Sequence, residues 1–156
     1  MSNGIKVKKR NGRGTEALNL EKMHKMVEEA TKGIAGVSAS QVEIQSGIQF
    51  YDGITTDEIQ EILIKSASDL ITLENPNYQF VAARLLLFAV RKQIYGKIRE
   101  LPHLETHIMG CCNQDVYDKD IFTKYSKEEI DKVNGYIDHE RDFLFTYAGL
   151  RQVVDK

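Results

Sequence analysis

The alternation of apolar and polar positions at the start of the chain is that of a short strand pair. Residues 5–8 alternate apolar and basic side chains, which is the period of a half-exposed strand. Residues 11–14 are Asn-Gly-Arg-Gly, and glycines tolerate the positive φ angles of tight turns. Residues 15–18 supply the returning strand. The pattern therefore predicts a small β-hairpin at the front of the chain.

Start signals for three helices follow the hairpin. Asn19 is a typical N-cap, and a stripe of apolar residues at helical spacing runs from it to a glycine stop at Gly33. Ser38 and Thr55 each precede a Gln or Glu by three residues, which is the spacing of a capping box. We expect helices over about 20–32, 39–48 and 56–71.

A fourth helix is expected from about Tyr78 to Tyr95. Its middle is apolar nearly all round, which predicts a central, buried helix. Gly96 marks the boundary to shorter, more polar and more acidic helical patterns. They lie at roughly 103–112, 117–124, 127–137 and 142–154, the third opened by a Ser-x-x-Glu capping box at residue 126. The predicted fold is mainly α, with two parts, 5–96 and 97–156.

Composition indicates an ordinary globular chain, with 156 residues, 42% hydrophobic residues and a net charge of only −2. Two neighbouring cysteines, Cys111 and Cys112, favour free thiols in a reducing compartment over a strained bridge. No apolar run approaches the ~20 residues of a membrane span. We expect a soluble cytoplasmic protein with no membrane partner.

The charge is uneven, and this changes the picture. Residues 1–25 hold seven Lys or Arg against two Glu, whereas residues 97–156 hold nine basic against twelve acidic residues. A basic hairpin followed at once by a helix N-terminus places cations and free backbone N–H groups together, which favours an anion. Glu16 and Asn19 can bind hydroxyl or amino groups of the same ligand. A nucleotide fits better than a nucleic acid, which needs a longer basic track, although neither a Walker motif nor GxGxxG is present.

Two other groupings carry less chemistry. His103, His107 and Cys111 have the i, i+4, i+8 spacing of one helix face, but a structural zinc site needs four ligands, usually from two elements. We interpret them as a solvent-facing histidine pair beside ordinary cysteines, with no metal. Residues 138–142, DHERD, are interpreted as a salt-bridged junction, because no nucleophile accompanies the histidine.

Several stretches follow one another in a specific order over essentially the whole chain. They are VKKRNG at 7–12, LNLEK at 18–22, FYDGITT at 50–56, NYQFVAARL at 77–85, YIDHERD at 136–142 and FTYA at 145–148. In this order they resemble the ATP-cone, the N-terminal regulatory domain of the large subunit of aerobic class I ribonucleotide reductases, and the helical segment after it. The resemblance implies a four-helix unit capped by a short β-hairpin, followed by a small helical segment that leads into the reductase barrel.

The resemblance also implies a function and a site. The cone of that family binds ATP as activator or dATP as inhibitor of overall activity, with Mg²⁺ as a candidate companion ion. Lys9 and Lys92 match residues that meet phosphates. Phe88 matches an apolar wall of the nucleotide site. Thr56 matches a nucleotide contact at the start of the helix expected from residue 56. Matching the remaining nucleotide contacts are Arg10, Glu16, Asn19 and Lys22.

Two positions depart from that family. Gln60 and Ala89 stand where inhibitable members carry histidines, and neither side chain can become cationic. Each lost charge-assisted contact weakens binding by roughly 10- to 100-fold. An alternative is therefore a degenerate cone that acts only as a subunit-interaction module.

The family's catalytic and redox cysteines lie in the barrel, beyond residue 156. We expect that this chain is not catalytic alone, holds no redox cofactor and is a fragment or one piece of a split large subunit. The implied partners are the remainder of that subunit, with 97–156 as the docking side, and the radical-generating small subunit. A repressor built on a cone is disfavoured, because only four residues precede Ile5 and such proteins carry a zinc ribbon there.

Overall fold

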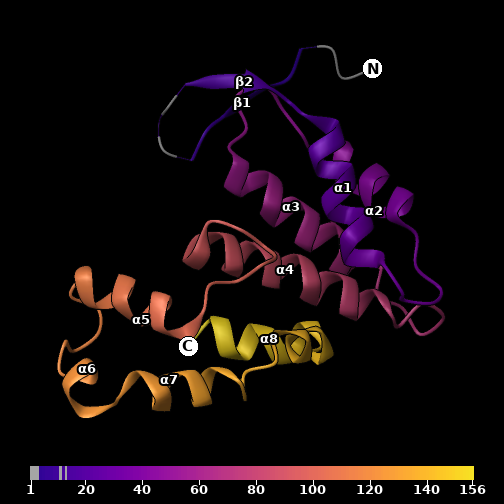
Figure 1. Ribbon diagram of the computed structural model, residues 1–156. Coiled ribbons are helices and arrows are strands. Elements are labelled where there is room, and N and C mark those ends of the chain that lie inside the picture. The colour runs from indigo at the N-terminus through magenta and orange to yellow at the C-terminus, as the bar shows by residue number, and fades with distance from the viewer. Residues whose placement is uncertain (1–3, 11, 13) are drawn as a thin grey trace. The chain divides into compact units, whose positions relative to one another are not determined.

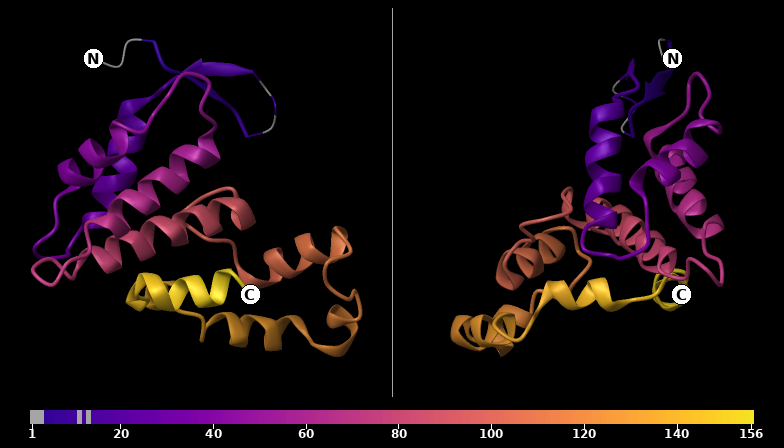
Figure 2. Two further views of the ribbon diagram at one scale, coloured as in Figure 1. Left: turned by 180° about the vertical axis from the view of Figure 1, so that it is seen from behind. Right: turned by 90° about the vertical axis from the view of Figure 1, so that its right-hand side faces the viewer.

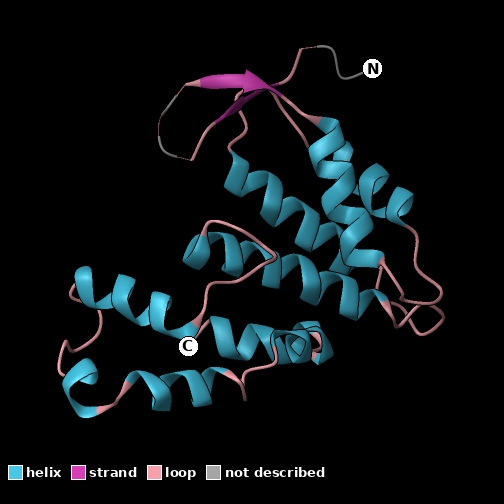
Figure 3. Cartoon of the chain, in the orientation of Figure 1, coloured by secondary structure: helices cyan, strands magenta, loops and turns pink. Residues whose placement is uncertain are grey.

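The computed structural model describes residues 4–10, 12 and 14–156. The described chain is mainly helical with one two-stranded sheet (Figure 3). It forms two compact units, Met1–Val90 with Phe143–Lys156, and Arg91–Asp142. The elements in chain order are β1 (Lys6–Lys8), β2 (Thr15–Ala17), α1 (Leu20–Thr31), α2 (Ala39–Gly47), α3 (Thr56–Asp69), α4 (Tyr78–Tyr95), α5 (Leu104–Asn113), α6 (Ile121–Lys124), α7 (Lys127–Asn134), the 3₁₀ helix η1 (His139–Leu144) and α8 (Tyr147–Val154).

The predicted hairpin is present, with β1 antiparallel to β2 and Val7 opposite Glu16. Of its predicted turn, Asn11 and Arg13 lie outside the described residues. The edge of β1 that does not face β2 is hydrogen-bonded to the segment just before α3. The Lys8 amide donates to the Ile54 carbonyl at 2.9 Å, and the Gly53 amide donates to the Lys6 carbonyl at 2.8 Å. These bonds hold the hairpin over the amino ends of α1 and α3 (Figures 1 and 2).

The predicted caps at Asn19 and Thr55 are confirmed. Asn19 accepts from the Lys22 amide, and Thr55 with Glu58 makes both bonds of a capping box. The expected box at Ser38 is only half correct. Ser38 accepts from the Gln41 amide at 3.4 Å, but Tyr78 replaces the return bond. The Ser38 amide donates to the Tyr78 hydroxyl at 3.0 Å, and that hydroxyl donates to the Gln41 carboxamide oxygen at 2.7 Å.

The core of the first unit is centred on α4, as its apolar pattern predicts. Fully buried side chains from α1, α2 and α3 pack with it, among them Val27, Val42, Leu63, Ile64, Val81 and Leu85. Arg84 satisfies the end of α1 by donating to the Lys32 carbonyl at 2.7 Å, and its guanidinium lies over the Phe143 ring at 5.2 Å. The buried helix therefore also supplies a polar stop for its neighbour.

Of the four helices predicted after α4, α5 has the expected length and the other three are shorter than predicted. A small cluster of Ile108, Cys112 and Ile130 forms the core of the second unit. The predicted helix at 117–124 shrinks to α6, and the one at 142–154 begins only at α8, where Thr146 accepts from the Gly149 amide at 3.2 Å. Residues 139–144 form η1 instead. Within the second unit, the nearly buried Arg91 donates to the His139 carbonyl and to the Asp142 carboxylate, each at 2.8 Å.

None of the helices in the described part of the chain is long and apolar enough to span a membrane.

The Tyr78 hydroxyl yields a stability prediction. The Tyr78 hydroxyl joins the Ser38 amide to the Gln41 carboxamide, and the Tyr78 side chain is only 2% exposed. Tyr78→Phe removes both hydrogen bonds, so we expect a loss of about 1–3 kcal/mol in the free energy of unfolding. The matched control is Tyr51→Phe, because Tyr51 is 51% exposed and bonds Glu58 at the surface. Tyr51→Phe should lower the free energy of unfolding by less than about 0.5 kcal/mol. Equal losses for the two variants in urea denaturation would contradict a stabilising role of the Tyr78 hydroxyl.

Candidate functional site

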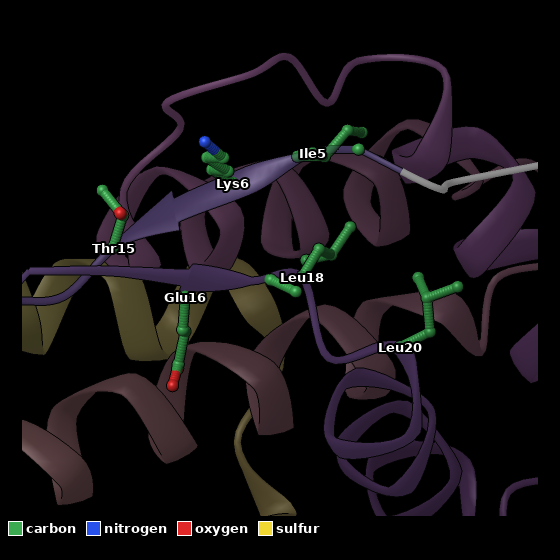
Figure 4. Close-up of a pocket in the computed structure, with 8 residues that line it drawn as sticks. Ile5, Lys6, Thr15, Glu16, Leu18 and Leu20 are labelled. Carbon is green, nitrogen blue, oxygen red and sulfur yellow. The ribbon is translucent and has the colours of Figure 1, made fainter.

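The two faces of the hairpin carry different side chains. Val7 and Glu16 are opposite one another and share a face, and Val7 is buried at 4% exposure, so this face is directed inward. Figure 4 shows Glu16 pointing toward the helices while Lys6 and Thr15 point away. Lys9, two residues after Val7, reaches Glu16 with 2.9 Å between its ammonium nitrogen and the carboxylate. The inner face thus carries an ion pair that the sequence predicts as part of the site.

The amino end of α1 contributes to the same place. Asn19 accepts from the Lys22 amide at 2.9 Å, which positions the first turn. The hydrogen bond from Lys9 lowers the pKa of Glu16 below its ordinary value, and the charges of Lys9 and Lys22 act in the same direction against partial desolvation. Lys22 therefore lies within electrostatic reach of the Lys9–Glu16 pair. Of the predicted contacts, Lys9, Glu16, Asn19 and Lys22 are brought together.

The first turn of α3 meets the other side of the hairpin. The Thr56 hydroxyl donates to the Lys8 carbonyl at 3.3 Å. Arg10 binds Asp57 through two nitrogens, with Nε 2.6 Å from the carboxylate oxygen Oδ1 and Nη2 on the same oxygen. Both are predicted site residues. Thr56 thus joins α3 to the hairpin edge at Lys8, and Arg10 joins the hairpin to α3 at Asp57.

The remaining predicted residues, Phe88 and Lys92, lie on α4. Phe88 is fully buried, edge-on to Phe143 with ring centroids 6.3 Å apart, so it is a core residue in this structure. Gln60 is also buried, and its amide donates to the Leu85 carbonyl at 3.0 Å. Ala89 is half-buried on α4. Lys92 is exposed near the end of α4, in the second unit. Its role as a phosphate contact stays a prediction.

Two open cavities adjoin the hairpin. One of about 480 Å³ is lined by Gly4, Ile5, Lys6, Thr15, Glu16, Ala17, Leu18 and Leu20 (Figure 4). The other, of about 730 Å³, is lined by Ile5, Leu18, Leu20, Glu21, Met23, His24, Glu43, Ile44, Gly47 and Phe50. The linings of these two cavities share Ile5, Leu18 and Leu20, and the first also includes Glu16.

Sequence reasoning missed two carboxylates at the hairpin. Asp52 accepts from the Lys6 amide at 2.8 Å, and Asp57 holds Arg10. The only available signals were an Asp-Gly turn at 52–53 and an acid in the first turn of a helix, and both have ordinary local explanations. Neither signal specifies a cation from the hairpin as the partner.

The histidines of the second unit do not form the expected solvent-facing pair. His103 caps α5 by accepting from the Glu105 amide, and its other nitrogen lies 3.4 Å from Asp131. His107 is half-buried between the rings of Tyr95 and Tyr117, with centroids 5.2 and 6.1 Å away. Its Nε2 lies 3.7 Å from the Cys111 sulfur. A grouping of His103, Glu105 and Asp131 brings ligand atoms within 4.8 Å, but both histidine nitrogens already have partners there.

The segment 138–142 is the predicted salt-bridged junction. Arg91 pairs with Asp142, and Glu140 lies 4.0 Å from Arg99.

Residues 5–93 match the family described as the ATP cone domain. The chain belongs to the ATP-cone family. Over its full length it is 43% identical to ribonucleoside-diphosphate reductase 1 subunit alpha of Escherichia coli and 42% identical to the subunit alpha of Haemophilus influenzae. It is also 45% identical, over 78% of its length, to the subunit alpha of Enterobacteria phage T4. The chain spans about one fifth of the length of the two bacterial relatives and 16% of the phage one.

The Glu16 environment can be tested without a ligand. Lys9→Ala removes the group that contributes most to the lowered pKa, so the pKa of Glu16 should rise toward 4.5. Lys8→Ala makes the same charge change one residue away, on the outer face, and should leave the pKa of Glu16 lowered. Carboxyl NMR titration measures both.

Because the folded-state pKa is lowered, the contribution of Glu16 to stability is present above the unfolded pKa and is lost as the pH falls through the folded value. Equal effects of the two lysines would contradict the assignment of faces.

Proposed function

We propose that this chain is the N-terminal, nucleotide-binding regulatory portion of a ribonucleoside-diphosphate reductase large subunit, with ATP or dATP as effector. The observation that carries the proposal is the Lys9–Glu16 pair beneath the hairpin, with Lys22 and the amino end of α1 beside it. Membership of the ATP-cone family and 43% identity to a reductase subunit alpha support it.

The arrangement suits a nucleotide for a physical reason. The phosphates need cations and backbone donors, which Lys9 and the helix start supply, while Lys22 lies on the base and sugar side with Glu16 and Asn19. The ribose and base carry hydroxyl and amino groups, which Glu16 and Asn19 can bind with acceptor oxygens. We assign Lys9 and Lys92 to the phosphates, with Arg10 and Thr56 at the hairpin edge. Phe88 supports the site from the core.

Gln60 shapes the expected response. Its amide is neutral and committed to the Leu85 carbonyl, so it supplies no positive charge to a nucleotide. Ala89 offers no hydrogen bond. We therefore expect weaker binding than in relatives with histidines at these positions, by roughly 10- to 100-fold for each lost charged contact.

The proposed partners follow from the relatives. The chain covers about one fifth of the E. coli subunit, so the remainder of a large subunit is the first partner, and the radical-generating small subunit is the second. The proposed boundary of the cone lies at residue 96, close to the end of the family match at 93. In this proposal the reduction itself, with its redox cysteines, belongs to the barrel.

The nucleotide prediction uses two neighbouring lysines. Lys9→Ala should weaken ATP binding about 10- to 100-fold, because it removes a charge-assisted contact from the inner face. Lys8→Ala, with the same change of charge on the outer face, should weaken binding less than about threefold. Calorimetric titration with ATP and dATP measures both. Absence of binding by the unaltered chain at millimolar nucleotide would refute the proposed function.

Gln60 and Ala89, which replace histidines of the family, favour one second candidate, a cone that only holds subunits together. In that case Lys9→Ala leaves the ATP and dATP response of an assembled holoenzyme unchanged. A changed response excludes this candidate.

A further inference from the structure

The two hairpin cations proposed to contact nucleotide are each paired with a carboxylate of the chain itself. Lys9 is paired with Glu16, and Arg10 is paired with Asp57. Glu16 is itself a proposed nucleotide contact, so its carboxylate has a role once a ligand arrives. Asp57 has no such role in the proposed site. It is the carboxylate whose function remains to be explained.

Asp57 stands where a helix N-terminus favours an anion. It lies in the first turn of α3 together with Glu58. The Glu58 carboxylate is used by the capping box, accepting from the Thr55 amide and hydroxyl at 2.8 Å each. The Asp57 carboxylate is directed at the hairpin instead. It binds Arg10, a residue 47 positions earlier in the chain.

The bond lies where the hairpin changes from anchored strand to turn. Through Lys8, β1 is tied to the segment before α3 by backbone bonds. After Lys8 the backbone turns to partners within the hairpin, and the Lys9 amide donates to the Gly14 carbonyl at 3.1 Å. The Arg10–Asp57 pair therefore connects the start of the hairpin tip to α3.

We propose that Asp57 is an internal stand-in for a phosphate, and that nucleotide binding transfers Arg10 from Asp57 to the ligand. This inference rests on the proposed function and adds a regulatory contact to that site. The pair is autoinhibitory, because the carboxylate occupies a cation that the phosphates need.

The strength of the pair suits an exchange. Both side chains are well exposed, at 41% for Arg10 and 57% for Asp57. Such pairs change an equilibrium constant only about one- to fivefold, and salt screens them further. A triphosphate carries several negative charges against one on the carboxylate, so it displaces Asp57 at a modest cost in affinity. The net effect is a lower affinity than the same site would have without Asp57.

The test is a calorimetric titration of the full chain with ATP. Asp57→Asn keeps the shape of the side chain and removes its charge, and we expect ATP to bind about two- to fivefold more tightly. The matched control is Asp69→Asn, because Asp69 lies at the other end of the same helix and is also salt-bridged, to Lys65 at 2.7 Å. It should leave the ATP affinity unchanged.

The second arm shows whether Arg10 transmits the effect. In an Arg10→Ala background, Asp57→Asn should change the ATP affinity less than about 1.5-fold, because there is no cation to release. An equal gain in both backgrounds would mean simple charge repulsion and would overturn the exchange. The exchange would also be overturned if Asp57→Asn bound ATP with the same affinity as the unaltered chain. The proposed function would stand in that case, because the unaltered chain binds ATP. If neither chain binds ATP, both proposals fall.

Discussion

The pairing of β1 with the segment before α3 is the constraint on which the site depends. The bond from the Lys8 amide to the Ile54 carbonyl fixes the hairpin against a fully buried residue. Once that edge is fixed, alternation along the strand decides which side chains face inward. Val7, Lys9 and Glu16 then share the inner face, and Lys6 and Lys8 the outer one. A slip of one residue would exchange the two faces and move Lys9 away from α1.

The same constraint explains why a chain of net charge −2 can present a cationic site. Residues 1–25 hold seven Lys or Arg against two Glu, and the inner face of the hairpin carries the buried Val7. Each hairpin cation predicted to meet nucleotide is matched by a nearby carboxylate, Glu16 for Lys9 and Asp57 for Arg10. Clustered cations repel one another, and these carboxylates relieve that repulsion. In the proposed site these counter-ions hold the cations in place, and the proposed exchange replaces one of them with a ligand.

What the sequence predicts well is local. Asn19, Thr55 and Ser126 each act on a backbone amide within three residues, and their helices begin where the caps place them. The α4 helix agrees with its prediction at both ends, because a stretch that is apolar nearly all round can be satisfied only by burial. Membership of the cone family was likewise evident from ordered motifs.

The errors arise where contacts link distant residues. Tyr78 enters the cap at Ser38 from 40 positions away, and Arg91 draws in residues 139 and 142 from 48 and 51 positions away, where a 3₁₀ turn replaces the expected helix start. No local pattern shows such partners, because each residue has an adequate local explanation. The Arg10–Asp57 pair is of the same kind, separated by 47 positions. The acid in the first turn of α3 is ordinary as a helix residue. The regulatory role proposed for it depends on the arginine of the hairpin that the fold places against it.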